Sequence, residues 1–393
     1  RFSEIKMVLF FGNNYFFILI SWLFISCTMF PSKNADTAEV HTWIQNKIDK
    51  AQVSGLSYAL VNADGIVSSD VFGYAHLPDN KPLAQDSIFQ IASVSKLVTG
   101  TAVMILVEEG RISLETDIRT LLPFSIDNPS FPTSPITVSH MLRHLSGIKD
   151  DFDVMDAYYT FRCGDGGDSN YELTQYCADY LSKEGVLYNA EKNFTGKAPG
   201  TDYEYSNTAY GVLGVLVETV SGQSFTVFTR SRIFEPLGMK DTSWLFSQTD
   251  MSRFAYPHSE DGTVYPAYSF PTYPDGSLKT TKEDFSRFLS SMMKGGKGVF
   301  SSPNTLTKMI EKPALEGKMG LTWTPEPLKE FGINTESTTI GHTGGDDGII
   351  TAVLWNTKTH TGLIVFMNSG VKIDFRLFHL LDVIKYLVEE SGT

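Results

Sequence analysis

The sequence predicts an α+β protein, in which one antiparallel β-sheet is formed by N-terminal and C-terminal segments, is flanked by helices and carries an inserted, mainly helical lobe. Two β-rich runs joined by a hairpin turn lie near the start, and strand-like runs return near the end. Helical patterns joined by long loops fill the region between them. With 393 residues, 42% of them hydrophobic, the chain can bury a large core. A cleft between the sheet and the lobe is the expected place for a site.

The elements are predicted in chain order from their patterns. Apolar residues at helical spacing predict a first helix over 38–51. The β-rich runs 56–61 and 66–74 flank Asp64-Gly65, which is hairpin turn chemistry, so antiparallel sheet is expected early. Four helical patterns follow, at 93–109, 138–143, 173–182 and 209–220. Three strands and a closing helix are predicted at 338–341, 349–355, 363–366 and 375–389.

The N-terminal segment has the composition of a targeting sequence. Residues 8–32 carry no charge, and the stretch 15–30 is almost wholly apolar. This pattern predicts an export signal, or a retained membrane anchor, because its length approaches the roughly 20 residues that span a bilayer. Cys27 follows a small residue and is a lipidation candidate. We expect residues 1–37 to be a signal peptide or a membrane or lipid anchor with a linker. Residues 38–393 are expected to form the folded domain, with its helical lobe within about 100–275. The protein is expected to be periplasmic, attached to the cell surface as a lipoprotein or secreted.

Charge and cysteine content limit the partners and the redox state. The formal net charge of −13, without a Lys/Arg cluster, excludes nucleic acid as an expected partner. Cys163 and Cys177 are the cysteines outside the N-terminal segment. In an oxidising compartment we expect them to close a disulfide worth about 3 kcal/mol, with two free buried thiols as the alternative.

The tetrapeptide from Ser93 to Lys96 carries the first chemical signal. A serine becomes nucleophilic when a base lies nearby, and positions i and i+3 share one face of a helix. The same spacing occurs at four other serines: Ser3, Ser146, Ser291 and Ser369. Ser93 differs because it opens the apolar run 97–107, which predicts a helix N-terminus that favours negative charge. An ordinary N-cap is the alternative role for this serine.

Two further motifs lie near predicted element ends. Tyr205-Ser206-Asn207 comes directly before the helix 209–220, where a loop tip can aim a phenol into a cleft. A tyrosine beside an ammonium group is expected to have a lowered pKa and to relay a proton, while Asn207 could bind a substrate amide. The segment His342-Thr343-Gly344-Gly345 follows the strand 338–341, so its backbone lines the sheet edge and can supply an oxyanion donor.

With these three motifs in this order, the chain resembles the serine β-lactamase and penicillin-binding protein superfamily, in the branch of class C β-lactamases, serine D-Ala-D-Ala carboxypeptidases and related esterases. The resemblance runs from about Val40 to Leu387 and includes the runs 141–147, 236–239 and 276–288. It implies a β-lactamase/transpeptidase-like fold and no cofactor. His342 stands where the closing K-T-G motif has lysine, which is similar to carboxypeptidases and esterase-like members rather than to true class C β-lactamases.

The resemblance and the motifs together imply an acyl-enzyme mechanism. Ser93 attacks a carbonyl, Lys96 and Tyr205 jointly move the protons, and the backbone N–H groups of Ser93 and Gly345 bind the oxyanion. Substrate binding is assigned to Asn207, His342, Thr343 and Gly344. Among these, His342 is expected at the site rim, where it recognises a carboxylate or bonds Tyr205.

The expected activity is hydrolysis of an amide or ester bond in a small-molecule or peptide substrate, by a D-amino-acid peptidase, carboxypeptidase or esterase. A true β-lactamase and a non-catalytic penicillin-binding sensor are the alternatives. His140 and His144 lie four apart, but no Glu follows His140 as in metalloproteases, so no metal is expected. A group of aromatic residues is expected to pack within a loop rather than line a pocket: Tyr265, Tyr268, Phe270 and Tyr273.

Overall fold

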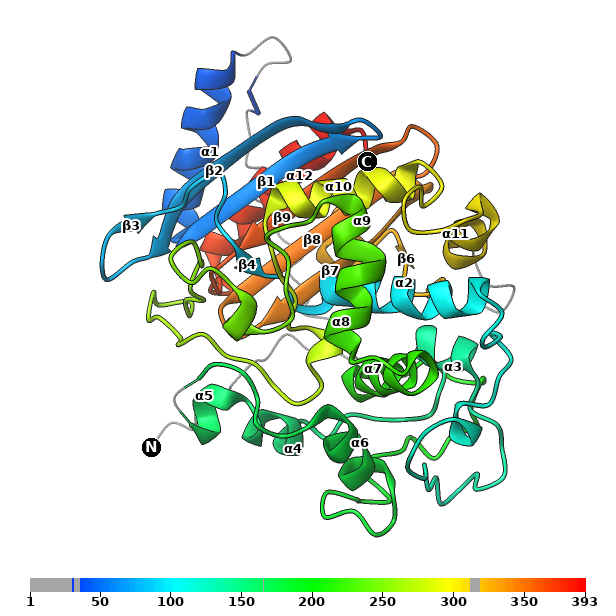
Figure 1. Ribbon diagram of the computed structural model, residues 1–393. Coiled ribbons are helices and arrows are strands. Elements are labelled where there is room, and N and C mark those ends of the chain that lie inside the picture. Colours follow the sequence, from blue (N-terminus) through cyan, green and yellow to red (C-terminus); the bar gives the residue numbers. More distant parts are fainter. Residues whose placement is uncertain (1–29, 32–35, 165, 312–318) are drawn as a thin grey trace.

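The computed structural model describes residues 30–31, 36–164, 166–311 and 319–393, and its centre is a seven-stranded antiparallel sheet (Figure 1). The strand order β3-β2-β1-β9-β8-β7-β6 places the first strand directly beside the last. The predicted sheet formed by both ends of the chain is therefore confirmed. The strands, including the separate pair β4-β5, are β1 (Gly55–Asn62), β2 (Gly65–His76), β3 (Lys81–Pro82), β4 (Phe89–Gln90), β5 (Lys279–Thr280), β6 (Thr324–Pro325), β7 (Thr339–Asp346), β8 (Ile349–Asn356) and β9 (Thr361–Met367).

Alternation along the strands explains why helices cover both faces of the sheet. Strands β1 and β2 form the predicted hairpin, with Asn62 paired to Gly65 across the turn. In β1, Leu56 and Tyr58 pack into the core on one face, whereas Ala59 and Val61 pack into the core on the other. A strand that is apolar on both sides needs a layer on each face.

The helices form those two layers and the lobe (Figure 1). One face of the sheet is covered by α1 and α12, and the other by α10 and α2, beyond which lie the helices of the lobe. The predicted lobe is confirmed. The α-helices are α1 (Thr37–Ala51), α2 (Ser95–Glu108), α3 (Val138–Leu142), α4 (Phe152–Ala157), α5 (Thr160–Cys163), α6 (Leu173–Leu181), α7 (Asn207–Ser221), α8 (Phe225–Thr229), α9 (Glu235–Leu237), α10 (Lys282–Met293), α11 (Pro303–Ile310) and α12 (Phe375–Ser391).

Short helical turns complete the chain, and two central helices are buried along most of their length. The short turns are η1 (Ala92–Val94), η2 (Ile118–Thr120), the π-helical η3 (Arg230–Phe234), η4 (Phe246–Gln248), η5 (Tyr273–Asp275) and η6 (Lys329–Phe331).

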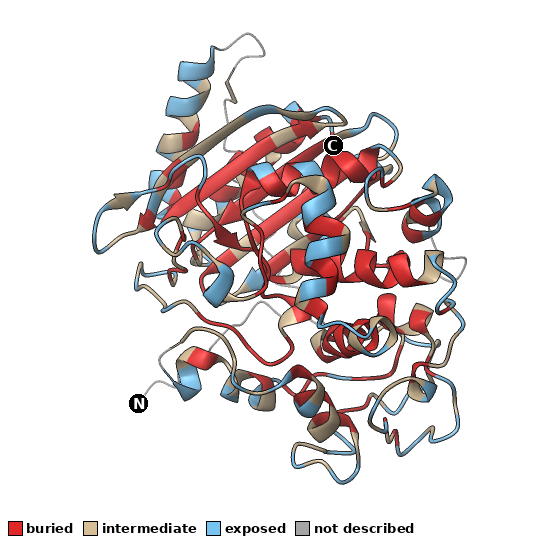
Figure 2. Ribbon diagram, viewed as in Figure 1, coloured by how far each residue is buried: buried red, intermediate tan, exposed pale blue. Residues whose placement is uncertain are grey.

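Helices α2 and α7 are buried almost throughout and connect the sheet to the lobe, whereas α1 is exposed on its outer side (Figure 2). Within the described ranges no single helix is long and apolar enough to cross a membrane. The helices 207–221 and 225–237, which form a bent pair, are long and apolar enough only when taken together.

The expected disulfide is wrong. Cys163 is exposed at the end of α5, and Cys177 is fully buried in α6 within the lobe core; both are free thiols. The two side chains face solvent and core respectively, so their packing keeps them apart. Burial also raises the pKa of the Cys177 thiol, which leaves it unreactive. The predicted export or anchor segment, including Cys27, lies almost wholly outside the described residues and stays a prediction.

Candidate active site

Ser93 lies on a sharp turn between strand β4 and helix α2. It is the middle residue of η1, and the preceding Ala92 has φ +45°, a region that residues with a Cβ rarely adopt. Thr351 of β8 donates a hydrogen bond to the Ile91 carbonyl at 2.8 Å and so holds this turn against the sheet. The N-cap of α2 is Val94, and the Ser93 side chain caps neither helix. The N-cap alternative for Ser93 is therefore wrong.

Lys96 is the second residue of α2; its side chain is fully buried and approaches the serine. Its Nζ lies 3.0 Å from Ser93 Oγ, 2.7 Å from Asn207 Oδ1 and 2.7 Å from the Asp275 carbonyl oxygen. The amide and carbonyl oxygens can only accept hydrogen bonds, so they take two N–H groups and leave the third position of the amine facing Ser93. Desolvation by burial lowers the pKa of Lys96 to about 8. A neutral amine with its lone pair toward the serine is therefore accessible near neutral pH.

The other predicted Ser-x-x-Lys pairs have different bonds. The hydroxyl of Ser146 accepts from the Ile148 amide, that of Ser291 donates to the Lys297 carbonyl, and that of Ser369 donates to the Gly370 carbonyl. Ser3 lies outside the described residues. Among the pairs that the structure describes, only Ser93 has its lysine as a hydrogen-bond partner.

Tyr205 lies against both catalytic candidates. Its hydroxyl shares a hydrogen bond with the Ser93 side chain, and the Lys96 ammonium is 5.0 Å from the ring centre. The ring stacks on His144 at 4.3 Å between centroids. The expectation of a lowered pKa is wrong, because burial raises the pKa of Tyr205 more than its bond to Ser93 lowers it. The phenol therefore stays protonated and is suited to donate a proton.

The loop that carries Tyr205 and Asn207 is fixed by two buried groups, His144 and Asp150. His144 Nδ1 accepts a hydrogen bond from the Ser206 amide at 3.0 Å, which leaves this ring neutral with its proton on Nε2. The carboxylate of Asp150 accepts from Ser206 Oγ at 3.0 Å, from the Asn207 amide at 2.6 Å and from the Thr208 amide at 3.0 Å. These bonds cap the N-terminus of α7 and set the position of Asn207 beside Lys96.

Strand β7 forms the opposite side of the site. A Cβ at Gly344 would lie 3.0 Å from the Ser93 nitrogen and 2.8 Å from the Ile91 carbonyl oxygen, so this position requires glycine for close approach. A Cβ at Gly345 would meet nothing within 4 Å, so Gly345 is not under the same packing constraint. Thr343 is half-buried on the alternate face of the strand.

His342 is 4% exposed, so the expected position at the rim is wrong. Its Nδ1 donates to the Thr343 carbonyl at 2.5 Å, and its ring centre is 6.4 Å from that of Tyr205. Burial and the nearby Lys96 lower the pKa of His342 to about 3, so the ring is neutral. A neutral ring carries no charge for the expected recognition of a carboxylate.

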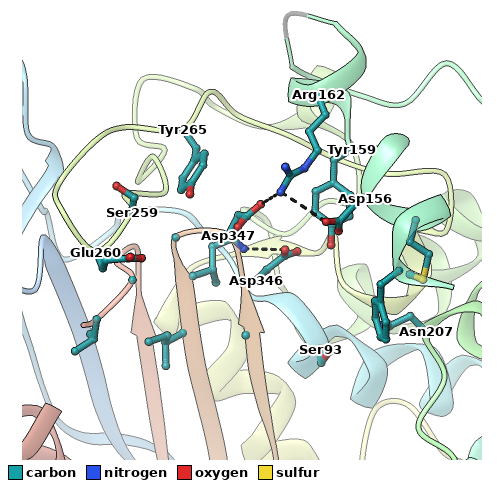
Figure 3. Close-up of a pocket in the computed structure, with 18 of the residues that line it drawn as sticks. Ser93, Asp156, Tyr159, Arg162, Asn207, Ser259, Glu260, Tyr265, Asp346 and Asp347 are labelled. Carbon is teal, nitrogen blue, oxygen red and sulfur yellow. Dashed lines mark hydrogen bonds and ion pairs between the residues drawn. The ribbon is translucent and has the colours of Figure 1, made fainter. Parts of the chain in front are cut away.

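A cavity of about 370 Å³ opens beside Ser93, and four of the predicted site residues line it: Ser93, Tyr205, Asn207 and Gly345. Its other walls come from α4 and α5 of the lobe, the β7–β8 turn and the segment after β9, so the cleft between sheet and lobe is confirmed (Figure 3). Tyr265 also lines the cavity, against expectation, whereas Tyr268, Phe270 and Tyr273 pack inside the protein.

Three carboxyl groups at the site were not predicted: Asp150, Asp275 and Asp346. Asp275 Oδ1 lies 3.9 Å from Lys96 Nζ, and burial raises the pKa of this carboxyl group. Asp346, at the end of β7, lines the cavity. A weak signal existed for Asp346, because it directly follows the predicted oxyanion segment; Asp150 and Asp275 become neighbours of Lys96 only through folding.

The comparisons with known proteins agree with this architecture. The Beta-lactamase family model matches residues 40–383. Penicillin-binding protein 4* of Bacillus subtilis is 29% identical over 256 residues, which cover 61% of this chain and 52% of that protein. The chain thus spans about half the length of this relative.

Two solved structures illustrate the structural similarity. The octameric penicillin-binding protein homologue from Pyrococcus abyssi has a TM-score of 0.70 at 24% identity, covering 89% of this chain and 77% of that one. The D-amino acid amidase from Ochrobactrum anthropi SV3, complexed with L-phenylalanine amide, has a TM-score of 0.67 at 22% identity, covering 89% and 97%. At these identities the two structures support the fold alone.

Proposed function

Because the chain belongs to the Beta-lactamase family, a family of serine hydrolases, we propose that it hydrolyses an amide or ester bond through an acyl-enzyme on Ser93. The substrate expected from the sequence is a D-amino-acid peptide, a related amide or an ester. One observation carries the proposal: the Ser93 hydroxyl lies 3.0 Å from a buried lysine amine and opens onto a cavity. An N-cap serine or a structural serine needs neither feature.

The first step is proton transfer from Ser93 to Lys96. With two of its N–H groups held by Asn207 and Asp275, the neutral amine has its lone pair toward Ser93 Oγ and can take the proton as the oxygen attacks the carbonyl carbon. A pKa of about 8 leaves roughly one molecule in ten with neutral Lys96 at pH 7. The geometry thus favours Lys96 as the base.

Tyr205 is suited to the second proton transfer. Its raised pKa keeps the phenol protonated, so it can donate to the leaving group and recover a proton from Lys96. The backbone N–H groups of Ser93 and Gly345 are assigned to the oxyanion, and each such donor is typically worth about 3 to 4 kcal/mol in the transition state. Water then attacks the acyl-enzyme and releases the acid, with the same groups acting in reverse.

The test is covalent labelling of the purified full chain with a fluorophosphonate probe, followed by mass spectrometry of the labelled peptide. We expect one label, on Ser93, and no label in Ser93→Ala. Ser291→Ala is the matched control, because Ser291 has the same spacing to a lysine but bonds the Lys297 carbonyl instead. A label that persists in Ser93→Ala would overturn the assignment, as would unchanged turnover of a p-nitrophenyl ester by that variant.

A further inference from the structure

One face of strand β7 carries a row of residues across the catalytic centre. Side chains alternate along a strand, so His342, Gly344 and Asp346 project to the same side. That side is the one facing the nucleophile, because a Cβ at Gly344 would lie 3.0 Å from the Ser93 nitrogen. His342 thus lies on one side of Ser93 and Asp346 on the other. Figure 3 shows Asp346 at the strand end, on the cavity wall near Ser93.

Asp346 is a cavity carboxylate whose cationic neighbour, Lys96, acts on it only from beyond ion-pair distance. Within the described part of the chain it forms no ion pair; it accepts hydrogen bonds from the Asp347 amide at 2.8 Å and from the Tyr159 phenol, while the nearby Tyr268 hydroxyl donates to the Asp347 carbonyl at 2.7 Å. Asp347, by contrast, is paired with Arg162 at 2.7 Å. Burial and the neighbouring Asp347 raise the pKa of Asp346 to about 7. An ammonium group of a substrate would give Asp346 a cation in direct contact.

The His342 end of the row is uncharged. Because a carbonyl oxygen only accepts, the bond to Thr343 places the ring proton on Nδ1 and leaves Nε2 as an acceptor. This nitrogen is buried and has no hydrogen-bond partner among the described residues. A carboxylate, which only accepts when ionised, finds no donor at this nitrogen, which can only accept a hydrogen bond from an N–H or O–H group.

The cavity lining as a whole is acidic, like the Asp346 end of the row on β7. Its lining contains four carboxylic acid side chains and two basic ones: Asp156, Glu260, Asp346, Asp347, Arg162 and Lys372. Arg162 is engaged by Asp347 and lies 4.0 Å from Asp156, as Figure 3 shows. A carboxylate substrate would enter a cavity with two more acids than bases. A cationic substrate would reduce that excess.

We infer that Asp346 binds a free ammonium group on the acyl side of the substrate, so that this site hydrolyses amides or esters of amino acids or peptides with an unblocked amino group. This inference rests on the proposed acyl transfer at Ser93. An α-ammonium lies two bonds from the scissile carbonyl carbon, and Asp346 follows directly on Gly345, whose N–H is assigned to the oxyanion. Lactams and peptides recognised through a carboxylate are disfavoured substrates.

The test compares two substrates, one with a free ammonium group and one in which an acetyl group has removed this charge. Alanine p-nitroanilide, in its D and L forms, is compared with its N-acetyl derivative at pH 7.5, where an α-amino group with a pKa of about 7.7 to 8.0 keeps most of its proton. We expect the wild-type full chain to prefer the free amine in kcat/KM by at least about tenfold for one enantiomer. Asp346→Asn should reduce this preference about 10- to 100-fold, mainly through KM, and Asp346→Glu should restore part of it.

Glu260→Gln is the matched control, because it removes another cavity carboxylate, at an exposed position. It should change the preference by less than about twofold. Turnover of p-nitrophenyl acetate and fluorophosphonate labelling of Ser93 report on acyl transfer alone. Loss of both in the wild type would overturn the proposed function. If the wild type shows both the turnover and the labelling, two results would overturn the role of Asp346. One is no preference for the free amine, and the other is a preference that Asp346→Asn leaves intact.

Discussion

Lys96 and Lys279 both lose all contact with solvent on folding, and the protein surrounds them differently. Desolvation lowers the pKa of each amine, to about 8 for Lys96 and to about 7 for Lys279. Lys279 Nζ donates to the Trp244 carbonyl at 2.7 Å and to Ser277 Oγ at 2.9 Å, and it lies 3.8 Å from the centre of the Phe246 ring. By pKa alone, Lys279 would be the better general base.

The neighbours of each amine, rather than its pKa, separate the two sites. Ser277, the serine bonded to Lys279, is fully buried and does not line the cavity. Ser93, the serine bonded to Lys96, does line it and lies beside a second proton donor, Tyr205. A perturbed lysine becomes a candidate base only when a nucleophile, a cavity and a fixed geometry accompany it. The comparison can be tested at four points.

Removing the amine should have the largest effect. Lys96→Met keeps the length of the side chain without a base, and we expect the rate of fluorophosphonate labelling and kcat/KM for a p-nitrophenyl ester to fall about 10²- to 10⁴-fold. Lys279→Met should change both by less than about threefold per folded molecule, because Lys279 contacts no reacting group. Equal losses in the two variants would contradict the distinction, and circular dichroism of both establishes the folded fraction.

The pH dependence should distinguish the two amines next. If neutral Lys96 is the base, kcat/KM rises about tenfold per pH unit below its pKa of about 8 and levels off above it. Lys279→Met should leave this profile in place. A profile that is flat between pH 6 and 8, or that moves in Lys279→Met, would show that another group controls the reaction.

The fold and the nucleophile could be predicted from local signals. The Asp64-Gly65 turn and the alternating strands are short-range patterns, so the sheet followed from them. Ser93 and Lys96 are three residues apart at the start of a predicted helix, so the sequence could nominate this pair, although Asn207 and Asp275 also hold the amine in place. The signals that predicted these features lie within short stretches of the sequence.

The charges around the site could not be predicted, because they depend on contacts between distant parts of the chain. Asp275 reaches Lys96 across 179 positions, and Asp150 reaches Asn207 across 57. Burial likewise reversed the expected pKa shift of Tyr205, and sequence spacing alone does not measure burial. The disulfide was wrong for a similar reason, since the core packing of Cys177 decides its orientation.

The support of Asn207 by Asp150 has no counterpart at Lys279, and its removal should have a smaller effect. Asp150→Ala leaves three donors at the start of α7 without their acceptor, so we expect a loss of about 3 kcal/mol in the free energy of unfolding. A displaced Asn207 should lower kcat about tenfold and shift the kinetic pKa of Lys96. Asp150→Asn should recover part of both. A stability loss with an unchanged pH profile would restrict Asp150 to a structural role.

The smallest effect is the pH dependence of the unfolding free energy that results from burying Lys279. Its folded pKa of about 7 lies below its unfolded value, so the unfolded chain binds one more proton between those values, and this contribution to stability falls as pH falls from about 10.4 toward 7. The expected slope is about 1.4 kcal/mol per pH unit. Lys279→Met removes the titrating group, so the difference in unfolding free energy between wild type and variant, measured by urea denaturation between pH 7.5 and 9.5, should carry this slope. Other groups titrate in both proteins and cancel. A pH-independent difference would mean that Lys279 keeps its charge when buried. The Phe246 ring and the two oxygen atoms that accept from Lys279 would then stabilise an ammonium group rather than a neutral amine.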